Sequence, residues 1–555
     1  MLRKWILAIA MVMTASLPPV LRSQSTQSMP GMSGMKDSVA KRKPASKKKK
    51  QTKPGKKKST VARKRPVSAM KMPRQAHDSS AGTRVTDSMP AMPSMPPRSD
   101  SSRPMNMTDS APMRDTSAMR MPMGMAMGSS RPMTADDMMI GPLGVSMERM
   151  GSGTTWIPDA VTMPSRRTMM GSWMLMAHGF VFAQYDHQSG KRGDDQLGSV
   201  NWMMLMATKN LAGGRFQART MLSLDALGVT SRGYPLLLQT GESFNGVLLH
   251  DRQHPHDFWM ELGALYQREL SKTLGWSIYA APSGEPALGP VAFMHRPSAM
   301  DNPTAPISHH WQDATHVTFG VLTGGLFARK FQIEGSLFNS RDPDQHRWNF
   351  DRIKLDSYSS RITFNPAAVW SLSAGYGFLR SHEAFDPAES MHRVTASVLN
   401  GRSVGSDGQV ASALIWGANK HAGHPLLAQS FLGESEAILD RHNTVFGRIE
   451  WVQKSAEDLV VDNGSPSAIA SGAPTFPTEQ NFNVAALELG YIREILRTHW
   501  ATLGLGGAGT INFVPSLLEP AYGSRTPLGA FVFLRLRPFH DRRTRVGGEA
   551  METHE

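Results

Sequence analysis

Polar and apolar residues alternate in runs of roughly ten to fifteen residues along most of the chain after Pro158. Polar Gln332 and Glu334, for example, alternate with apolar Phe331 and Ile333. Successive side chains of a β-strand point to opposite faces of its sheet, so this period of two predicts strands with one polar and one apolar face.

Clusters of Gly, Asn, Pro and Asp separate these runs and mark turns. The pattern predicts sixteen strands, at 171–186, 199–208, 213–226, 257–270, 273–283, 313–323, 326–339, 355–365, 368–380, 389–400, 408–418, 427–439, 442–454, 482–495, 498–511 and 527–538.

Charged residues lie on one face of several predicted strands. Arg448 and Glu450 alternate with Ile449 and Trp451, for example. This pattern is uncommon in the core of a soluble sandwich, but it is expected where one face lines a wet lumen and the other meets lipid. A soluble β-sandwich or β-propeller is the alternative that the pattern leaves open.

The connections between these strands alternate in length. Short ones, such as 209–212 and 271–272, alternate with long ones such as 227–256, 284–312 and 455–481. Short turns at one end and long loops at the other are typical of outer-membrane barrels. We therefore predict an all-β fold, a transmembrane antiparallel up-and-down β-barrel of about 16 strands whose first and last strands pair, preceded by a disordered N-terminal arm.

The chain divides by composition into five parts. Residues 1–23, with a charged start and a short apolar run, resemble a signal peptide, although an inner-membrane anchor is an alternative. We expect 24–134 to be a disordered arm rich in Met, Pro, Ser and Lys, because it has too few large apolar residues to form a core. A lead-in at 135–170, the barrel at 171–539 and a polar tail at 540–555 follow.

The positive charge belongs to the arm and not to the barrel. Of 61 basic and 46 acidic residues, 27 and 9 lie before residue 151, so the remaining residues are nearly neutral. Nucleic acid is therefore not an expected partner. The expected partners are outer-membrane lipid and lipopolysaccharide, which the basic run at 36–65 would contact unless it is only a solvated spacer. The chain has no cysteine, which excludes disulfides and thiolate metal sites.

Methionines are concentrated and regularly spaced in the arm. The region from Met29 to Met150 contains 21 of the 38 methionines. Thioethers are soft, uncharged ligands that select Cu(I) or Ag(I), although compositional drift is an equally simple explanation. No cofactor is required on this reading. The predicted soft-metal ligands are Met29, Met32, Met35, Met119, Met121, Met123, Met125 and Met127.

Histidines gather in two predicted loops. His254 and His256 precede the fourth strand, and His309 and His310 precede the sixth, with His316 nearby. Imidazoles bind Cu(II), Zn or Ni, so these four side chains are candidate metal ligands. The alternative is structural, with the imidazoles pairing Asp side chains to hold the loops inside the barrel.

No nucleophile motif, phosphate loop or dinucleotide fingerprint is present, so no catalytic residue is predicted. An esterase or lipase would need a serine beside a histidine, for which Ser308 is the example.

Three stretches carry a resemblance to a known family. MGSGTTWIPD at 150–159, LHDRQHPHDFWME at 249–261 and the segment 284–323 resemble a family of uncharacterised bacterial outer-membrane-type proteins, over Met147 to Phe539. RDPDQHRW at 341–348 fits the same family. The resemblance implies location and brings no established activity. MPGMSGM in the arm is similar to the Met-rich segments of copper-resistance outer-membrane protein B, which implies a soft-metal role for the matching methionines only.

These observations predict a barrel in the bacterial outer membrane with both termini in the periplasm. Its predicted function is metal (copper) handling or passive transport of small solutes, and a structural or enzymatic barrel is the alternative. The connection 284–312 is long enough to fold inward as a plug.

Overall fold

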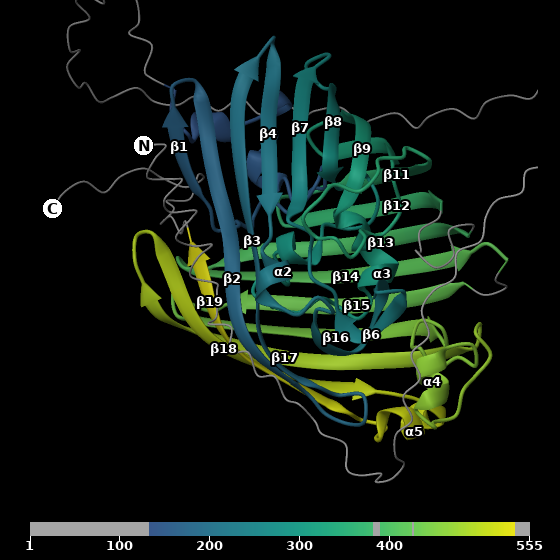
Figure 1. The fold of residues 1–555 in the computed structure, drawn as a ribbon. Helices are drawn as coiled ribbons and strands as arrows, with labels where there is room; N and C mark the ends of the chain where they lie inside the picture. Colours follow the sequence, from purple (N-terminus) through teal and green to yellow (C-terminus); the bar gives the residue numbers. More distant parts are fainter. Residues whose placement is uncertain (1–132, 381–388, 424–426, 539–555) are drawn as a thin grey trace, which may run out of the picture. The chain divides into compact units, whose positions relative to one another are not determined.

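A computed structural model describes residues 133–380, 389–423 and 427–538. Sixteen antiparallel strands form one ring (Figure 1). They are β2 (Trp173–Gln188), β3 (Asp195–Leu211), β4 (Gly214–Leu222), β7 (Trp259–Glu269), β8 (Gly275–Gly284), β9 (Thr318–Phe327), β10 (Phe331–Phe338), β11 (Ser357–Phe364), β12 (Trp370–Arg380), β13 (Ser390–Val404), β14 (Gly408–His421), β15 (Ala428–Ile438), β16 (Asn443–Ser455), β17 (Asn481–Arg497), β18 (Ala501–Phe513) and β19 (Leu528–Pro538).

The ring is closed, as the sequence predicts. Each strand pairs with the next strand of the ring, and β19 pairs antiparallel with β2 from Gly529 opposite Gln188 to Leu536 opposite Val181. A short strand, β1 (Arg166–Met170), pairs with the start of β2. Closure leaves no free sheet edge, which is what allows strands to cross a lipid bilayer.

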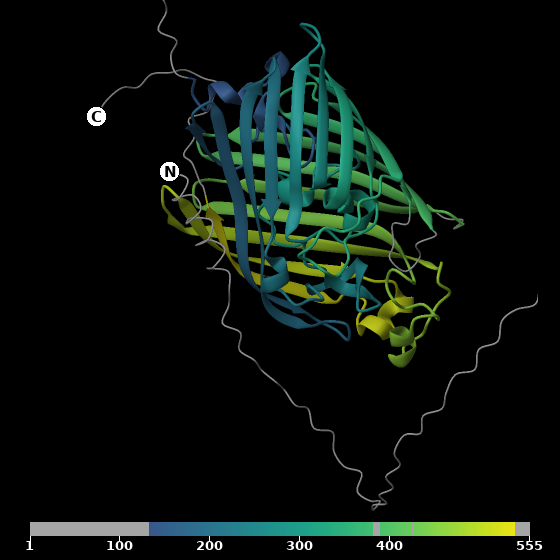
Figure 2. The ribbon, with the colours of Figure 1, turned by 45° about the horizontal axis from the view of Figure 1, so that its top comes forward.

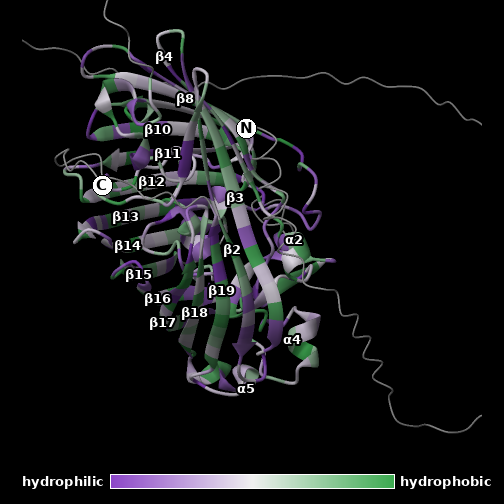
Figure 3. Ribbon diagram, turned by 90° about the vertical axis from the view of Figure 1, so that its left-hand side faces the viewer, coloured by the Kyte–Doolittle hydropathy of each residue, from purple (hydrophilic) through white to green (hydrophobic). Residues whose placement is uncertain are grey.

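The barrel is apolar outside and charged inside. On β17, Leu487 and Leu489 face outward with 46% and 66% of their surface exposed, whereas the alternating Glu488 is buried. The same alternation colours the strands in Figure 3. A soluble protein would bury the leucines and expose the glutamate, so this arrangement identifies the outer surface as the lipid-facing surface of a transmembrane barrel.

The alternation of loop length is also confirmed. Short turns join β3 to β4, β7 to β8 and β17 to β18, and the long connections leave the opposite ends of the strands. Three predicted strands are wrong in part. The strand predicted at 326–339 begins only at Phe331, because β9 continues to Phe327 and the turn to β10 spans 328–330. The strand predicted at 313–323 begins only at Thr318, because 313–317 turn inward, and the strand predicted at 213–226 ends at Leu222, after which a helical turn forms.

Three segments enter the ring (Figures 1 and 2). The lead-in contains η1 (Asp137–Met139), η2 (Pro142–Gly144) and η3 (Met147–Arg149). The β4–β7 connection contains α2 (Asp225–Gly228) and a hairpin of β5 (Tyr234–Phe244) and β6 (Val247–Gln253). The β8–β9 connection contains η4 (Phe293–His295), α3 (His309–Gln312) and η5 (Ala314–His316).

Other helical turns lie in the remaining long loops. They are α4 (Pro466–Ala470), η6 (Ser516–Leu518) and α5 (Glu519–Tyr522). Within the part of the chain that the structure describes, no helix has the length and apolar character needed to cross a membrane.

Candidate metal-binding region inside the barrel

The β8–β9 connection, residues 285–317, is a plug inside the ring: all of its residues except His310 and Ala314 are buried. Arg296 is fully buried and binds Glu434 of β15 through both Nε and Nη2, at 2.5 and 3.2 Å. Its Nη1 donates to Asp313 at 3.0 Å and to the carbonyl of Val291 at 2.9 Å. The Arg296 guanidinium therefore links the parts of the plug around Val291 and Asp313 to Glu434 of the barrel wall.

Further buried contacts fix the plug to neighbouring strands. Asp301 accepts hydrogen bonds from Arg537 of β19 at 2.6 and 2.8 Å and pairs with Arg535 at 2.6 Å. Glu450 of β16 accepts the backbone N–H and the hydroxyl of Ser308, at 2.9 and 2.6 Å. Buried charges are stable only when paired and hydrogen-bonded, so the charged inner faces of these strands hold the plug.

The lead-in is bound to the opposite side of the ring. Arg219 of β4 donates to the carbonyl of Gly153 at 2.7 Å, and Arg361 of β11 donates to the Thr154 hydroxyl at 3.0 Å. Arg215 donates to the carbonyls of Met138 and Ile140. Residues 151–158 of the lead-in are all buried and therefore lie inside the ring, whereas Asp137, Ile140 and Gly144 are exposed.

The β5–β6 hairpin is the third inward segment. Lys454 of β16 donates to the carbonyl of Leu238 at 2.6 Å and to the Thr240 hydroxyl at 3.0 Å. Glu242 pairs with Arg347 and with His254. Burial alone would raise the pKa of Glu242, but Arg347 and His254 lower it to about 2. The hairpin is thus held by ionised groups at neutral pH.

The four predicted histidines come together in the space that these segments enclose. His254 and His256 lie in the loop after β6, as Pro255 suggests, and their rings are 6.4 Å apart. His309 and His310 lie on α3, with ring centroids 5.3 Å apart. The His254 ring lies 5.9 Å from that of His310, so the two loops meet.

His316 joins the group, although it is not among the predicted ligands. Its ring lies 5.4 Å from His256 and 5.1 Å from His309. Phe293 of η4 packs against all three imidazoles. We call His254, His256, His309, His310 and His316 the histidine cluster. The sequence offered one indication of this position: His316 lies three residues after Asp313, a spacing at which a helical turn brings the two residues together.

Three members of the histidine cluster are held through Nδ1. His256 donates to Asp225 at 2.7 Å, His309 donates to the Asp313 carboxylate at 2.7 Å, and His316 donates to the Asp313 carbonyl at 2.9 Å. Fixing one ring nitrogen in this way leaves Nε2 as the potential metal ligand.

The Nε2 atoms of His256 and His316 are buried and have no hydrogen-bond partner. Burial lowers the pKa of His316 well below its ordinary value, so its imidazole is neutral. Among residues 133–380, 389–423 and 427–538, no three His, Cys, Asp or Glu side chains are placed to hold one metal ion together. An ion at the histidine cluster would therefore take at most two of these imidazoles and complete its shell with water.

The structural alternative is confirmed in part. His250 pairs with Asp251 at 2.8 Å and His309 with Asp313 at 2.7 Å. Asp257 and Asp301 instead pair with arginines, Arg347 at 3.2 Å and Arg537 at 2.6 Å respectively. Arginine offers more donors and a permanent charge, which suits a buried carboxylate.

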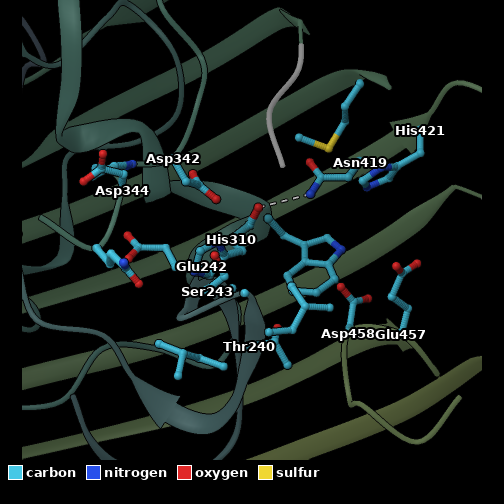
Figure 4. Close-up of a pocket in the computed structure, with 18 of the residues that line it drawn as sticks. Thr240, Glu242, Ser243, His310, Asp342, Asp344, Asn419, His421, Glu457 and Asp458 are labelled. Carbon is cyan, nitrogen blue, oxygen red and sulfur yellow. Dashed lines mark hydrogen bonds between the residues drawn. The ribbon is translucent and has the colours of Figure 1, made fainter. Parts of the chain in front are cut away.

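An acid-lined pocket of about 330 Å³ opens beside the histidine cluster (Figure 4). His310 lines it, and its carbonyl accepts a hydrogen bond from Asn419 at 3.1 Å. The other lining side chains include five acids and one arginine, Arg393. The acids are Glu242, Asp342, Asp344, Glu457 and Asp458. Burial raises the pKa of Asp342 to about 8, so this acid is mostly neutral at pH 7. Such a lining favours a cation.

The serine of the enzymatic alternative is directed elsewhere. Ser308 donates its hydroxyl to Glu450 at 2.6 Å, and the neighbouring His309 uses Nδ1 on Asp313. A hydroxyl that donates to a carboxylate is not hydrogen-bonded to an imidazole base, which a Ser–His pair requires. The arm methionines Met29, Met32, Met35, Met119, Met121, Met123, Met125 and Met127 lie outside the described residues.

No known protein family matches the chain, and no curated protein sequence matches it. Solved structures that it resembles are outer-membrane proteins at low identity. A loop-deletion form of OmpT, an outer membrane protein of Vibrio cholerae, shares 8% identity over 66% of this chain and 100% of its own, with a TM-score of 0.40. An anion-selective porin from Comamonas acidovorans shares 10% over 66% and 99%, with a TM-score of 0.37. OmpF of Salmonella typhi shares 8% over 67% and 99%, with a TM-score of 0.40.

Proposed function

We propose that this protein is a barrel of the bacterial outer membrane that handles copper by binding it inside the filled lumen. Single-chain barrels of this kind have short periplasmic turns and long outer loops. On that rule both termini face the periplasm, and the acid-lined pocket faces the outside. The apolar outer face and the closed ring support the location.

One observation carries the function. Imidazoles from two separate connections meet in the barrel, three of them oriented through Nδ1 by Asp225 or Asp313. A buried nitrogen without a partner costs about 1–3 kcal/mol, so the Nε2 atoms of His256 and His316 favour a ligand that supplies a bond. Neutral imidazole with oxygen ligands suits Cu(II). The neighbouring carboxylates attract the ion.

Passive transport is the weaker of the two predicted functions. A diffusive porin needs a continuous aqueous lumen. Here Arg296 and Asp301 are fully buried where the plug meets the wall, and Arg361 of β11 is buried against the lead-in. Both segments therefore occupy part of the lumen.

The test is Cu(II) binding by the refolded full-length chain, followed by electron paramagnetic resonance. We expect hyperfine coupling to two imidazole nitrogens in the wild type and its loss in His316→Asn and in His256→Asn. His392→Asn is the matched control, because His392 is exposed on the outer face of β13 and bonds Tyr376. Heat-modifiable migration verifies that each variant is folded. Unchanged coupling in both cluster variants would refute the proposal.

A further inference from the structure

A second cavity, of about 40 Å³, lies inside the barrel between β2, β3, β4 and the lead-in. Eight of its fifteen lining residues are methionines. Met174, Met176, Met204 and Met206 come from the wall, and Met139 and Met147 are among those from the segments before β2. The space suffices for one ion or one water molecule.

The strand register explains how the wall methionines meet. On β2, Met174, Met176 and His178 alternate with outward residues and so share the inner face. On β3, Met206 lies opposite Met176, and Met204 lies opposite His178. Side chains directly opposite across an antiparallel pair are close enough to interact. The register therefore places three thioethers and one imidazole next to one another.

His178 is a buried side chain of this cavity whose two ring nitrogens, Nδ1 and Nε2, both lack a hydrogen-bond partner. It is 4% exposed. Its ring is surrounded by Trp202 at 5.3 Å and His295 at 5.4 Å, and His295 itself contacts the Met221 sulfur at 3.3 Å. An imidazole buried with both nitrogens unpaired is costly unless a ligand or a water bonds to it.

Three charged residues line the cavity, and each has a partner of opposite charge, which for Arg219 lies outside the lining. Arg167 pairs with Glu148 at 2.6 Å, and Arg219 pairs with Glu261 at 2.7 Å. The other lining side chains with donor atoms are the eight thioethers, the His178 imidazole, the Ser165 hydroxyl and the Gln217 amide. The wall positions that the register of β2 and β3 brings together supply only thioether and imidazole donors. Such donors select a soft ion over hard cations. A neutral, buried set of ligands also favours a single positive charge, because the cost of burying an ion rises with its charge.

We infer that this cavity, which we call the methionine cavity, binds one Cu(I) or Ag(I) ion through Met204, Met206, Met176 and His178. The biological role of this site rests on the proposed copper function. The binding of a soft monovalent ion does not, because the methionine cavity and the histidine cluster have no ligand in common. The competing explanation is that methionine, a flexible side chain, merely fills an irregular gap.

The experiment uses the refolded full-length chain with methionine methyl groups labelled with ¹³C. Titration with Ag(I), which is redox-inert, is followed by methyl NMR, and retained silver per chain is measured after dialysis. The test variant is Met204→Leu/Met206→Leu, which nearly preserves volume. The matched control is Met260→Leu/Met294→Leu, because both residues are buried in the barrel but do not line the cavity.

We expect the test variant to retain one silver ion fewer per chain than the wild type, and the control variant to retain the wild-type number. In the wild type, the Met204 and Met206 methyl signals, assigned as those missing from the spectra of the folded single variants Met204→Leu and Met206→Leu, should shift on adding Ag(I). Equal silver retention in all three chains, equal loss in both variants, or unshifted cavity signals would each overturn the inference. Cu(II) resonance at the histidine cluster should be unchanged in the test variant, so failure of one site is distinguishable from failure of the other.

Discussion

Replacing Arg296 with methionine tests whether buried charge holds the plug in the barrel. The guanidinium is fully buried and donates to Glu434, Asp313 and the carbonyl of Val291. Methionine keeps much of the side-chain length but supplies no donor. Glu434 would still accept a hydrogen bond from the Ser298 hydroxyl at 2.7 Å and would still pair with Arg448 at 3.6 Å. It would lose Arg296, the guanidinium that binds both of its carboxylate oxygens.

The expected magnitude follows from the two carboxylates left behind. Removing one partner of a buried ion pair costs about 3–5 kcal/mol, because the other charge stays buried without compensation. Every 1.4 kcal/mol is a tenfold change in an equilibrium constant, so opening of the plug should become roughly a hundredfold more frequent or more. Strands that do not contact the plug should be unaffected.

Hydrogen exchange followed by mass spectrometry is the assay, on the full chain in detergent. Amides of 285–317 should exchange at least a hundredfold faster in Arg296→Met, while those of β12 should not change. Adding Glu434→Gln should recover part of the loss, because a neutral amide is cheaper to bury than an unpaired carboxylate. Wild-type exchange of the plug in Arg296→Met would refute the reasoning.

Three further changes test other parts of the structure. Leu489→Arg places a charge on the lipid-facing surface and should cost about 2–4 kcal/mol near the bilayer midplane, measured by equilibrium refolding into vesicles. Gly241→Val, at φ +115°, would bring a Cβ to 2.1 Å from the His310 ring and should lower the thermal midpoint. The Glu242–Arg347 pair should stabilise the hairpin fully above about pH 4.5 and cease to do so as the pH falls toward 2, measured by proteolysis of the hairpin across that range.

Each of these changes has a control in the same chain. Leu489→Ala removes the side chain without adding charge and should cost far less in the refolding assay. Gly246→Val has a similar positive φ of +75° but no neighbour within 4 Å, so it separates backbone strain from the clash with the ring. If both glycine variants lower the thermal midpoint equally, the clash is not the cause.

The barrel could be predicted from the sequence because its signals are local. Alternation such as Arg448, Ile449 and Glu450 identifies a strand and its two faces from neighbouring residues. The lengths of connections show which ends of the strands carry turns. The errors at 313–317 and 223–226 arose where tertiary contacts override local pattern, since these residues leave the wall to join the inward segments.

The interior could not be predicted in the same way. Period-two alternation shows that Glu434 faces inward, but not that Arg296, 138 residues earlier, meets it. The histidines of two loops were recognised as candidates, whereas only the fold brings them within 5.9 Å of one another. The methionine cavity depends on the register of β2 against β3, which places His178 opposite Met204. Residues next to each other in the chain determine whether a segment forms a strand. Packing between distant segments determines the strand register and the insertion of loops into the barrel, and it therefore determines where the candidate metal ligands meet.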